Sequence, residues 1–135
     1  MKFDWSAYFN LAKELAETSE EAELRSAVSR AYYSAFCLAR NYLRDIEQDP
    51  TLSRNKTDIN VHKYVADEFI HHKSNHKSKS QTMREIGNNL KRLRNMRNKA
   101  DYEDTMFNLK IIKKEAKTAL MLAENIISAL NKLTE

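Results

Sequence analysis

The scarcity of turn-forming residues constrains the fold of this chain more than any other feature of its sequence. Its 135 residues contain one glycine and one proline, whereas β-sandwiches and β-barrels need such residues at the many short turns between their strands. Alanine, leucine, lysine and glutamate, which favour helices, are abundant instead. With 41% apolar residues the chain can bury a core, so we predict a folded all-α protein.

Apolar residues recur at helical spacing in five segments of the chain. The predicted helices follow Asp4 for about four turns, cover roughly 19–47, cover 61–70, follow the segment 71–80, and run from Phe107 to Leu133. The polar segments 51–60 and 71–80 have no helical period and are predicted to be loops. Because no repeat or linker divides the chain, we expect residues 1–135 to form one up-and-down helical bundle.

Composition also indicates where such a protein works. The only cysteine, Cys37, cannot form an internal disulfide, which is typical of a reducing compartment. No apolar run reaches the length of a membrane span, and the N-terminus MKFDWSAYFN lacks the pattern of a signal peptide. We therefore expect a cytoplasmic protein with no membrane contact.

Motifs of several common enzyme classes are absent from the sequence. One glycine excludes a P-loop and a dinucleotide-binding fingerprint. Four histidines, His62, His71, His72 and His76, raise the question of a metal site, since His72 and His76 are four residues apart. No cysteine pair or His-Glu-x-x-His pattern accompanies them, so we interpret them as exposed histidines. Neither a metal nor another cofactor is expected.

Positive charge is concentrated between residues 72 and 99, although the formal charge of the chain is only +4. Lysine and arginine side chains supply most of the affinity for a phosphate backbone by releasing counterions. We predict that six of them contact RNA: Lys73, Lys77, Lys79, Arg84, Lys91 and Arg94. The alternative is an ordinary solvated helix surface.

Residues 93–102, LRNMRNKADY, form the most site-like segment of the chain. Arg97 and Asp101 are four residues apart and could form an ion pair on one helix face. The spacing of Arg97 from Leu93 places it toward the inner face, so it either pairs with a carboxylate or phosphate or the helix is rotated toward water. Tyr102 either donates a hydrogen bond from a mostly buried ring or presents its phenol to a ligand.

Two blocks together resemble the HEPN family: 24–36, LRSAVSRAYYSAF, and 93–102, LRNMRNKADY. The first is similar to that family's Ser-Arg-Ala-Tyr-Tyr-x-x-Phe helix and the second to its Arg-Asn-x-Ala-Asp-Tyr form, and the resemblance extends from Trp5 to about Leu130. It implies a helical bundle that commonly forms homodimers. It also implies a prokaryotic toxin–antitoxin or defence module, in which many members are metal-independent endoribonucleases.

In the active ribonucleases of this family an arginine, the polar residue after it and a histidine shortly beyond form the catalytic site. Arg97 and Asn98 match the first two. The histidine does not carry over, because Asp101 and Tyr102 follow instead and no histidine lies beyond His76.

The resemblance leaves three hypotheses for function. In the first, the chain contacts RNA or a nucleotide through Arg97, Asn98 and the basic region, with weak or no cleavage. In the second, a non-catalytic module dimerises and binds a nucleotide or a nucleotidyltransferase antitoxin, which modifies Tyr102. In the third, the chain is a ribonuclease in which Asp101 or Tyr102 replaces the histidine. The large side chains of Tyr32, Tyr33 and Phe36 exceed what one inward stripe needs, so some are expected at the dimer interface.

Overall fold

The structure of the chain, a computed structural model, describes residues 2–52, 60–105 and 108–135. Every regular element in these ranges is helical, as predicted. The α-helices are α1 (Ser6–Ala16), α2 (Glu21–Asn41), α3 (Val61–Ile70), α4 (Lys77–Tyr102) and α5 (Leu109–Leu133). A π-helical turn, η1 (Tyr42–Ile46), continues α2, and a 3₁₀ turn, η2 (Pro50–Leu52), follows it. Within the described ranges, no helix is long and apolar enough to cross a membrane.

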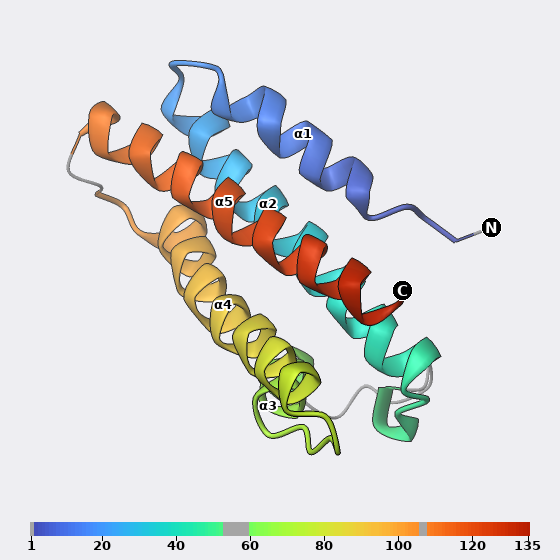
Figure 1. The fold of residues 1–135 in the computed structure, drawn as a ribbon. Coiled ribbons are helices and arrows are strands. Elements are labelled where there is room, and N and C mark those ends of the chain that lie inside the picture. The colour runs from blue at the N-terminus through green and yellow to red at the C-terminus, as the bar shows by residue number, and fades with distance from the viewer. Residues whose placement is uncertain (1, 53–59, 106–107) are drawn as a thin grey trace.

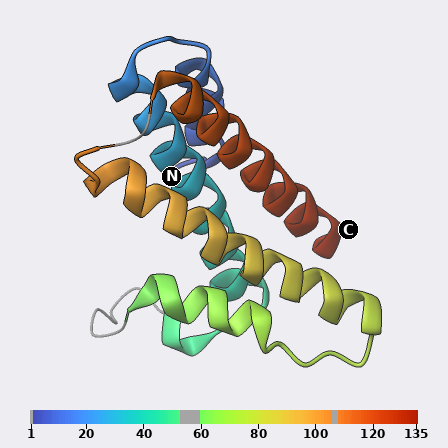
Figure 2. The same ribbon diagram turned by 90° about the vertical axis from the view of Figure 1, so that its left-hand side faces the viewer.

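The three long helices, α2, α4 and α5, pack against one another, and the two short ones cover opposite sides (Figure 1). α1 packs against α2 and α5, whereas α3 packs mainly against α4. Figure 2 shows α4 lying between α3 and α5. This arrangement gives α4 one side facing α3 and another facing α5.

Small side chains let the long helices approach closely. On α2, four fully buried alanines recur every fourth residue, at Ala27, Ala31, Ala35 and Ala39. Three more, Ala116, Ala119 and Ala123, are fully buried on α5. Alanine rows of this kind leave shallow ridges, which allow neighbouring helix axes to lie near each other. Larger side chains from α2, α3, α4 and α5 fill the remaining core, and the partly buried Phe9 and Leu15 of α1 pack against it.

The only glycine of the chain, Gly87, lies in the middle of α4 where α3 crosses it. A Cβ atom at this position would lie 2.6 Å from Cγ1 of Ile70 and 2.7 Å from the backbone oxygen of Ala66. Those distances are shorter than atoms can tolerate, so the α3–α4 packing depends on the absence of a side chain at residue 87.

Several predicted boundaries differ from the observed ones. The predicted loop 71–80 is wrong for its last four residues, because α4 already begins at Lys77. Its first turn, residues 77–80, consists of lysine and serine only, so it carries no apolar period. The first helix has 11 residues rather than about four turns, and its N-cap is Trp5, while the Asp4 carboxylate accepts the Ser6 backbone N–H. The predicted start of the last helix, Phe107, and residues 53–59 of the predicted loop 51–60 lie outside the described residues.

The aromatic residues of α2 belong to the core of the chain itself. Tyr32 is 1% exposed and Phe36 is 4% exposed, so neither side chain has surface to offer a second copy of the chain. The expectation that some of the three aromatic residues lie at a dimer interface therefore rests on Tyr33 and stays a prediction. Tyr33 is only half-buried. These three aromatic rings contact His62 of α3, and the two tyrosine rings also contact Arg97 of α4. The same contacts form the candidate site.

Candidate functional site

Arg97 is buried against two tyrosine rings of α2. Its guanidinium carbon lies 5.3 Å from the ring centre of Tyr32 and 5.4 Å from that of Tyr33, within the range of cation–π attraction. The residue is 7% exposed, and it continues the buried stripe of Leu90 and Leu93 on α4. Of the two orientations left open by the sequence, the inward one is therefore observed.

The predicted ion pair between Arg97 and Asp101 is confirmed, but it is long. Nη1 of Arg97 lies 3.8 Å from Oδ2 of Asp101, and the same oxygen accepts a hydrogen bond from Oγ of Ser29 at 3.3 Å. Nε of Arg97 is buried and has no hydrogen-bond partner among the described residues. The guanidinium therefore has donor capacity that the protein does not use. Because burying an incompletely paired charge is costly, an anionic ligand at this place would be favoured.

Arg25 joins the two sequence blocks that carry the family resemblance. Its Nη1 donates to the backbone oxygens of Ala100 at 3.1 Å and Glu103 at 2.7 Å. Its Nε also pairs with Glu21 at 3.0 Å. A cation that binds the last carbonyls of a helix is favoured by the helix dipole. Arg25 thus holds the C-terminal end of α4, where Asp101 and Tyr102 lie, a role that the sequence analysis missed.

Tyr102 and Asn98 differ in how far they reach solvent. Tyr102 is 75% exposed, so it presents its ring outward and has no buried structural role. Asn98, directly after Arg97, is half-buried. The two ends of the segment therefore offer different chemistry, with a desolvated cation at Arg97 and an accessible phenol at Tyr102.

His62 is the functional candidate that sequence reasoning missed. The structure places it on α3 against the same aromatic residues, and the interpretation that it is exposed is wrong, since it is half-buried. Its Nδ1 lies 2.6 Å from the Tyr32 hydroxyl, and its ring stacks on Phe36 at a centroid distance of 4.4 Å. His62, Ala66 and Phe69 share one helical face, so helical periodicity could have shown that His62 points inward.

Burial and nearby positive charges keep His62 neutral. Burial lowers the pKa of His62 to about 4, and the positive charges of Arg94 and Arg97 contribute. Burial also raises the pKa of Tyr32, so its phenol keeps its proton at neutral pH. Nδ1 of His62 is the one hydrogen-bond partner of the Tyr32 hydroxyl in the part of the chain that the structure describes. We therefore assign the phenol as the donor and Nδ1 as the acceptor, which leaves the imidazole proton on Nε2.

A cavity of about 250 Å³ opens beside this histidine, between α2, α3 and α4. It is lined by Tyr32, His62, Lys63, Ala66, Leu90, Lys91, Arg94 and Asn95. Two of the residues predicted to bind RNA, Lys91 and Arg94, are thus brought to the same place. Lys91 pairs with Asp67 at 2.9 Å, as does Lys63 at 2.8 Å. Arg94 is half-buried, and its Nε has no hydrogen-bond partner in the part of the chain that the structure describes.

The other predicted RNA contacts lie toward the N-terminal end of α4. Lys73 is exposed in the segment before the helix, and Lys77 and Arg84 are exposed on it. Lys79 pairs with Glu47 at 3.3 Å. Residues 77, 84, 91 and 98 are each seven apart, a spacing at which side chains drift by only about 20° per step around a helix. One stripe of α4 therefore leads from Lys77 to Asn98.

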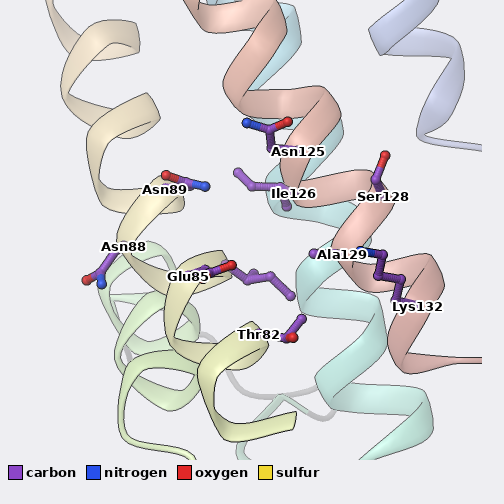
Figure 3. Close-up of a pocket in the computed structure, with 10 residues that line it drawn as sticks. Thr82, Glu85, Asn88, Asn89, Asn125, Ile126, Ser128, Ala129 and Lys132 are labelled. Carbon is purple, nitrogen blue, oxygen red and sulfur yellow. The ribbon is translucent and has the colours of Figure 1, made fainter. Parts of the chain in front are cut away.

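A second cavity, of about 380 Å³, lies between α4 and α5 and contains none of the predicted site residues. Figure 3 shows Thr82, Glu85 and Asn89 of α4 near Asn125, Ser128 and Lys132 of α5. Ile126 and Ala129 supply apolar surface there. Glu85 and Lys132 bring one charge of each sign to this cavity, so its lining has no net formal charge, in contrast to the cationic cavity beside His62.

The described ranges contain no group of three or more histidine, cysteine, aspartate or glutamate residues placed to hold a metal ion. His72, for which a metal role was considered, instead lies 3.7 Å from a carboxylate oxygen of Glu47. A family model described as HEPN domain matches residues 6–133. No curated protein and no solved structure matches the chain.

Proposed function

Because this chain belongs to the HEPN family, whose members are often ribonucleases or nucleotide-binding modules, we propose that it binds RNA along α4 as part of a prokaryotic toxin–antitoxin or defence module. The observation that carries the proposal is Arg97. Its guanidinium is buried and incompletely paired at the end of the basic helix, as expected of an arginine that receives a phosphate.

The charge distribution supports contact with a polyanion. α4 carries eight lysine or arginine side chains and two carboxylates, a formal charge of +6, whereas the entire chain carries +4. The stripe from Lys77 to Asn98 spans about 30 Å at the rise of an α-helix. A groove or face of that length can follow the backbone of several nucleotides.

We propose weak or no cleavage. The carboxylate of Asp101 already accepts a hydrogen bond from Ser29 and faces Arg97, so its Oδ2 is engaged within the protein. Tyr102 is 75% exposed whereas Arg97 is 7% exposed, so the phenol and the guanidinium lie in different surroundings. Neither residue is a good replacement for the histidine expected after Arg97.

The experiment is an RNA cleavage and binding assay in EDTA. A labelled structured RNA is incubated with the purified protein and, in parallel, with Arg97→Ala. We expect binding that weakens with salt and with the substitution, and little cleavage. Cleavage by the parent alone would show a metal-independent ribonuclease, whereas the absence of binding at low salt would contradict the proposal.

A second candidate function is supported by the exposure of Tyr102. A nucleotidyltransferase antitoxin that modifies a tyrosine close to the Arg97 motif needs an accessible phenol, and this one is 75% exposed. Co-expression with such a partner should then add the mass of one or more nucleotides to the chain. Tyr102→Phe removes the acceptor oxygen and is the control. An unchanged intact mass would eliminate this candidate.

A further inference from the structure

We propose that the cavity beside His62 binds a phosphate group of a ribonucleotide or RNA, with His62 and Arg94 as the principal donors. This inference rests on the proposed function and names a place on that surface where a phosphate is held. It also assigns a role to His62, a residue thirty-five positions before Arg97 in the chain.

The cavity offers donors on several sides. Nδ1 of His62 is occupied by the Tyr32 hydroxyl, so its Nε2–H is the group left for a ligand. Arg94 contributes a guanidinium with a buried Nε that has no partner within the described ranges. The amide of Asn95 lines the same cavity. Ala66, Leu90 and the ring of Tyr32 give the cavity apolar walls, and its polar groups are mainly N–H donors. Such donors select a ligand rich in acceptor oxygens, as a phosphate is.

The charges around His62 favour an anion. α3 presents Lys63 and Asp67, α4 presents Lys91, Arg94 and Arg97, and α2 presents the neutral phenols Tyr32 and Tyr33. Asp67 pairs with both lysines, so one carboxylate faces two ammonium groups. Asp101, the other acid, lies near Arg97. The two lysines and the two guanidiniums outnumber the two carboxylates, so the net charge around His62 is positive.

Two observations indicate a phosphate rather than a large ligand. The volume of about 250 Å³ is smaller than the roughly 300–1,000 Å³ typical of pockets that enclose drug-sized molecules. The ring of His62 is already stacked on Phe36, so that face is closed to a nucleobase. The sugar and base of a nucleotide would remain at the mouth of the cavity.

Anion binding should be coupled to the protonation of His62. Burial disfavours the imidazolium form in the free protein, and the charges of Arg94 and Arg97 add to this effect. A bound phosphate would offset the field of the two guanidiniums. The pKa of His62 therefore rises on binding. The phosphodiester groups of RNA, which do not titrate in this range as a phosphate monoester does, should bind more tightly as the pH falls from 7 toward 5.

The test is long-range ¹H–¹⁵N NMR of the histidine rings in the full chain, which distinguishes imidazole tautomers. Inorganic phosphate, 5′-AMP and a short single-stranded RNA are added in turn at constant ionic strength, with RNA binding followed separately by fluorescence anisotropy. We expect the Nε2–H tautomer at His62 and saturable shifts of its signals. His71, which is exposed at the end of α3, should not shift and is the internal reference.

Variants on one helix sharpen the result. Arg94→Gln should weaken saturation of the His62 signal by about tenfold or more, the value of one lost charge-assisted hydrogen bond. Arg92→Gln removes the same charge at an exposed position and should have an effect below about twofold. Equal effects of the two substitutions would overturn the assignment of Arg94, as would an unshifted His62 in the presence of all three ligands.

The outcomes separate this inference from the proposed function. If RNA binds by anisotropy while His62 does not respond, the cavity is not a phosphate site and the proposed function stands. If His62 responds to phosphate or 5′-AMP but RNA does not bind, the cavity is confirmed as a nucleotide site and the proposed function fails. A response to RNA at far lower concentration than to 5′-AMP identifies the polymer as the source of the phosphate.

Discussion

Two side chains of unlike chemistry share the ring pair Tyr32 and Tyr33. Arg97 lies over both rings, and His62 reaches the same rings from α3. Burial lowers the pKa of this histidine, and the nearby guanidiniums of Arg94 and Arg97 lower it further, so the imidazole is held neutral. The protein therefore keeps one permanent charge and one titratable group at the same desolvated place.

Acidification should destabilise the fold through His62 before the carboxylates titrate. The pKa of His62 is lowered to about 4 by burial and by Arg94 and Arg97, whereas an imidazole in an unfolded chain titrates near 6.5. The unfolded state thus binds the extra proton first, and the free energy of unfolding falls as the pH drops from about 7 toward 4. Urea unfolding at about pH 7 and pH 5 measures this loss.

His62→Gln keeps a partner for the Tyr32 hydroxyl but cannot titrate, so most of that loss should vanish in the variant. The matched control is His76→Gln, at an exposed position before α4. Carboxylates such as Asp67, whose pKa is lowered to about 2 by Lys63 and Lys91, lose their contribution only at lower pH. An equal loss in parent and His62→Gln would contradict this account.

Arg97 and Arg25 should respond in opposite ways to removal of their charge. Arg25 donates to two backbone oxygens at the end of α4, so Arg25→Met should cost about 2 kcal/mol of stability. Arg97 is buried with an incomplete set of partners, so Arg97→Met should leave stability within about 1 kcal/mol of the parent or raise it. Chemical denaturation checks both, and a larger loss for Arg97→Met would mean that its role is structural.

At the scale of single elements, the packing of α3 on α4 depends on Gly87, which has no side chain. Gly87 permits α3 to cross in contact with the α4 backbone. That contact places the histidine of α3 beside Arg94. The geometry of the candidate site therefore depends on helix packing as much as on the residues that line it.

Gly87→Ala tests this dependence, because the substitution has two effects of opposite sign on the stability of the fold. Alanine in a helix interior is favoured over glycine by about 1 kcal/mol. The added Cβ would clash with Ile70 and the backbone of Ala66, and forcing the helices apart costs about 1–3 kcal/mol. We expect net destabilisation and displacement of the His62 NMR signals. A variant more stable than the parent would show that α3 does not cross α4 this closely.

Sequence patterns predicted the elements better than the site. Composition and apolar spacing predicted five helices, because those signals are local. The start of α4 at Lys77 was missed because its first turn contains only lysine and serine and so has no apolar period. The pairing of Arg97 with Asp101 was predictable from their four-residue spacing, whereas the meeting of His62 and Arg94 was not. That meeting depends on how α3 packs on α4, which short-range spacing does not encode.

At the scale of the whole molecule, charge is unevenly distributed. α4 holds a formal +6 and the entire chain +4, so the remaining residues are net acidic. Such a distribution steers polyanions to one helix and leaves the rest of the surface unattractive to them. The homodimer expected from the family remains a proposal, and sedimentation equilibrium would measure it.

The most direct test of the account is RNA affinity measured by fluorescence anisotropy over a range of salt, with two matched double variants. Lys77→Glu with Arg84→Glu reverses two exposed charges on the α4 stripe, and Lys13→Glu with Lys117→Glu reverses two exposed charges on α1 and α5. Both doubles lower the net charge of the chain equally. The account predicts that the α4 double weakens binding by about tenfold or more and flattens the salt dependence, while the other double stays close to the parent. Equal weakening by both doubles would contradict an RNA surface on α4.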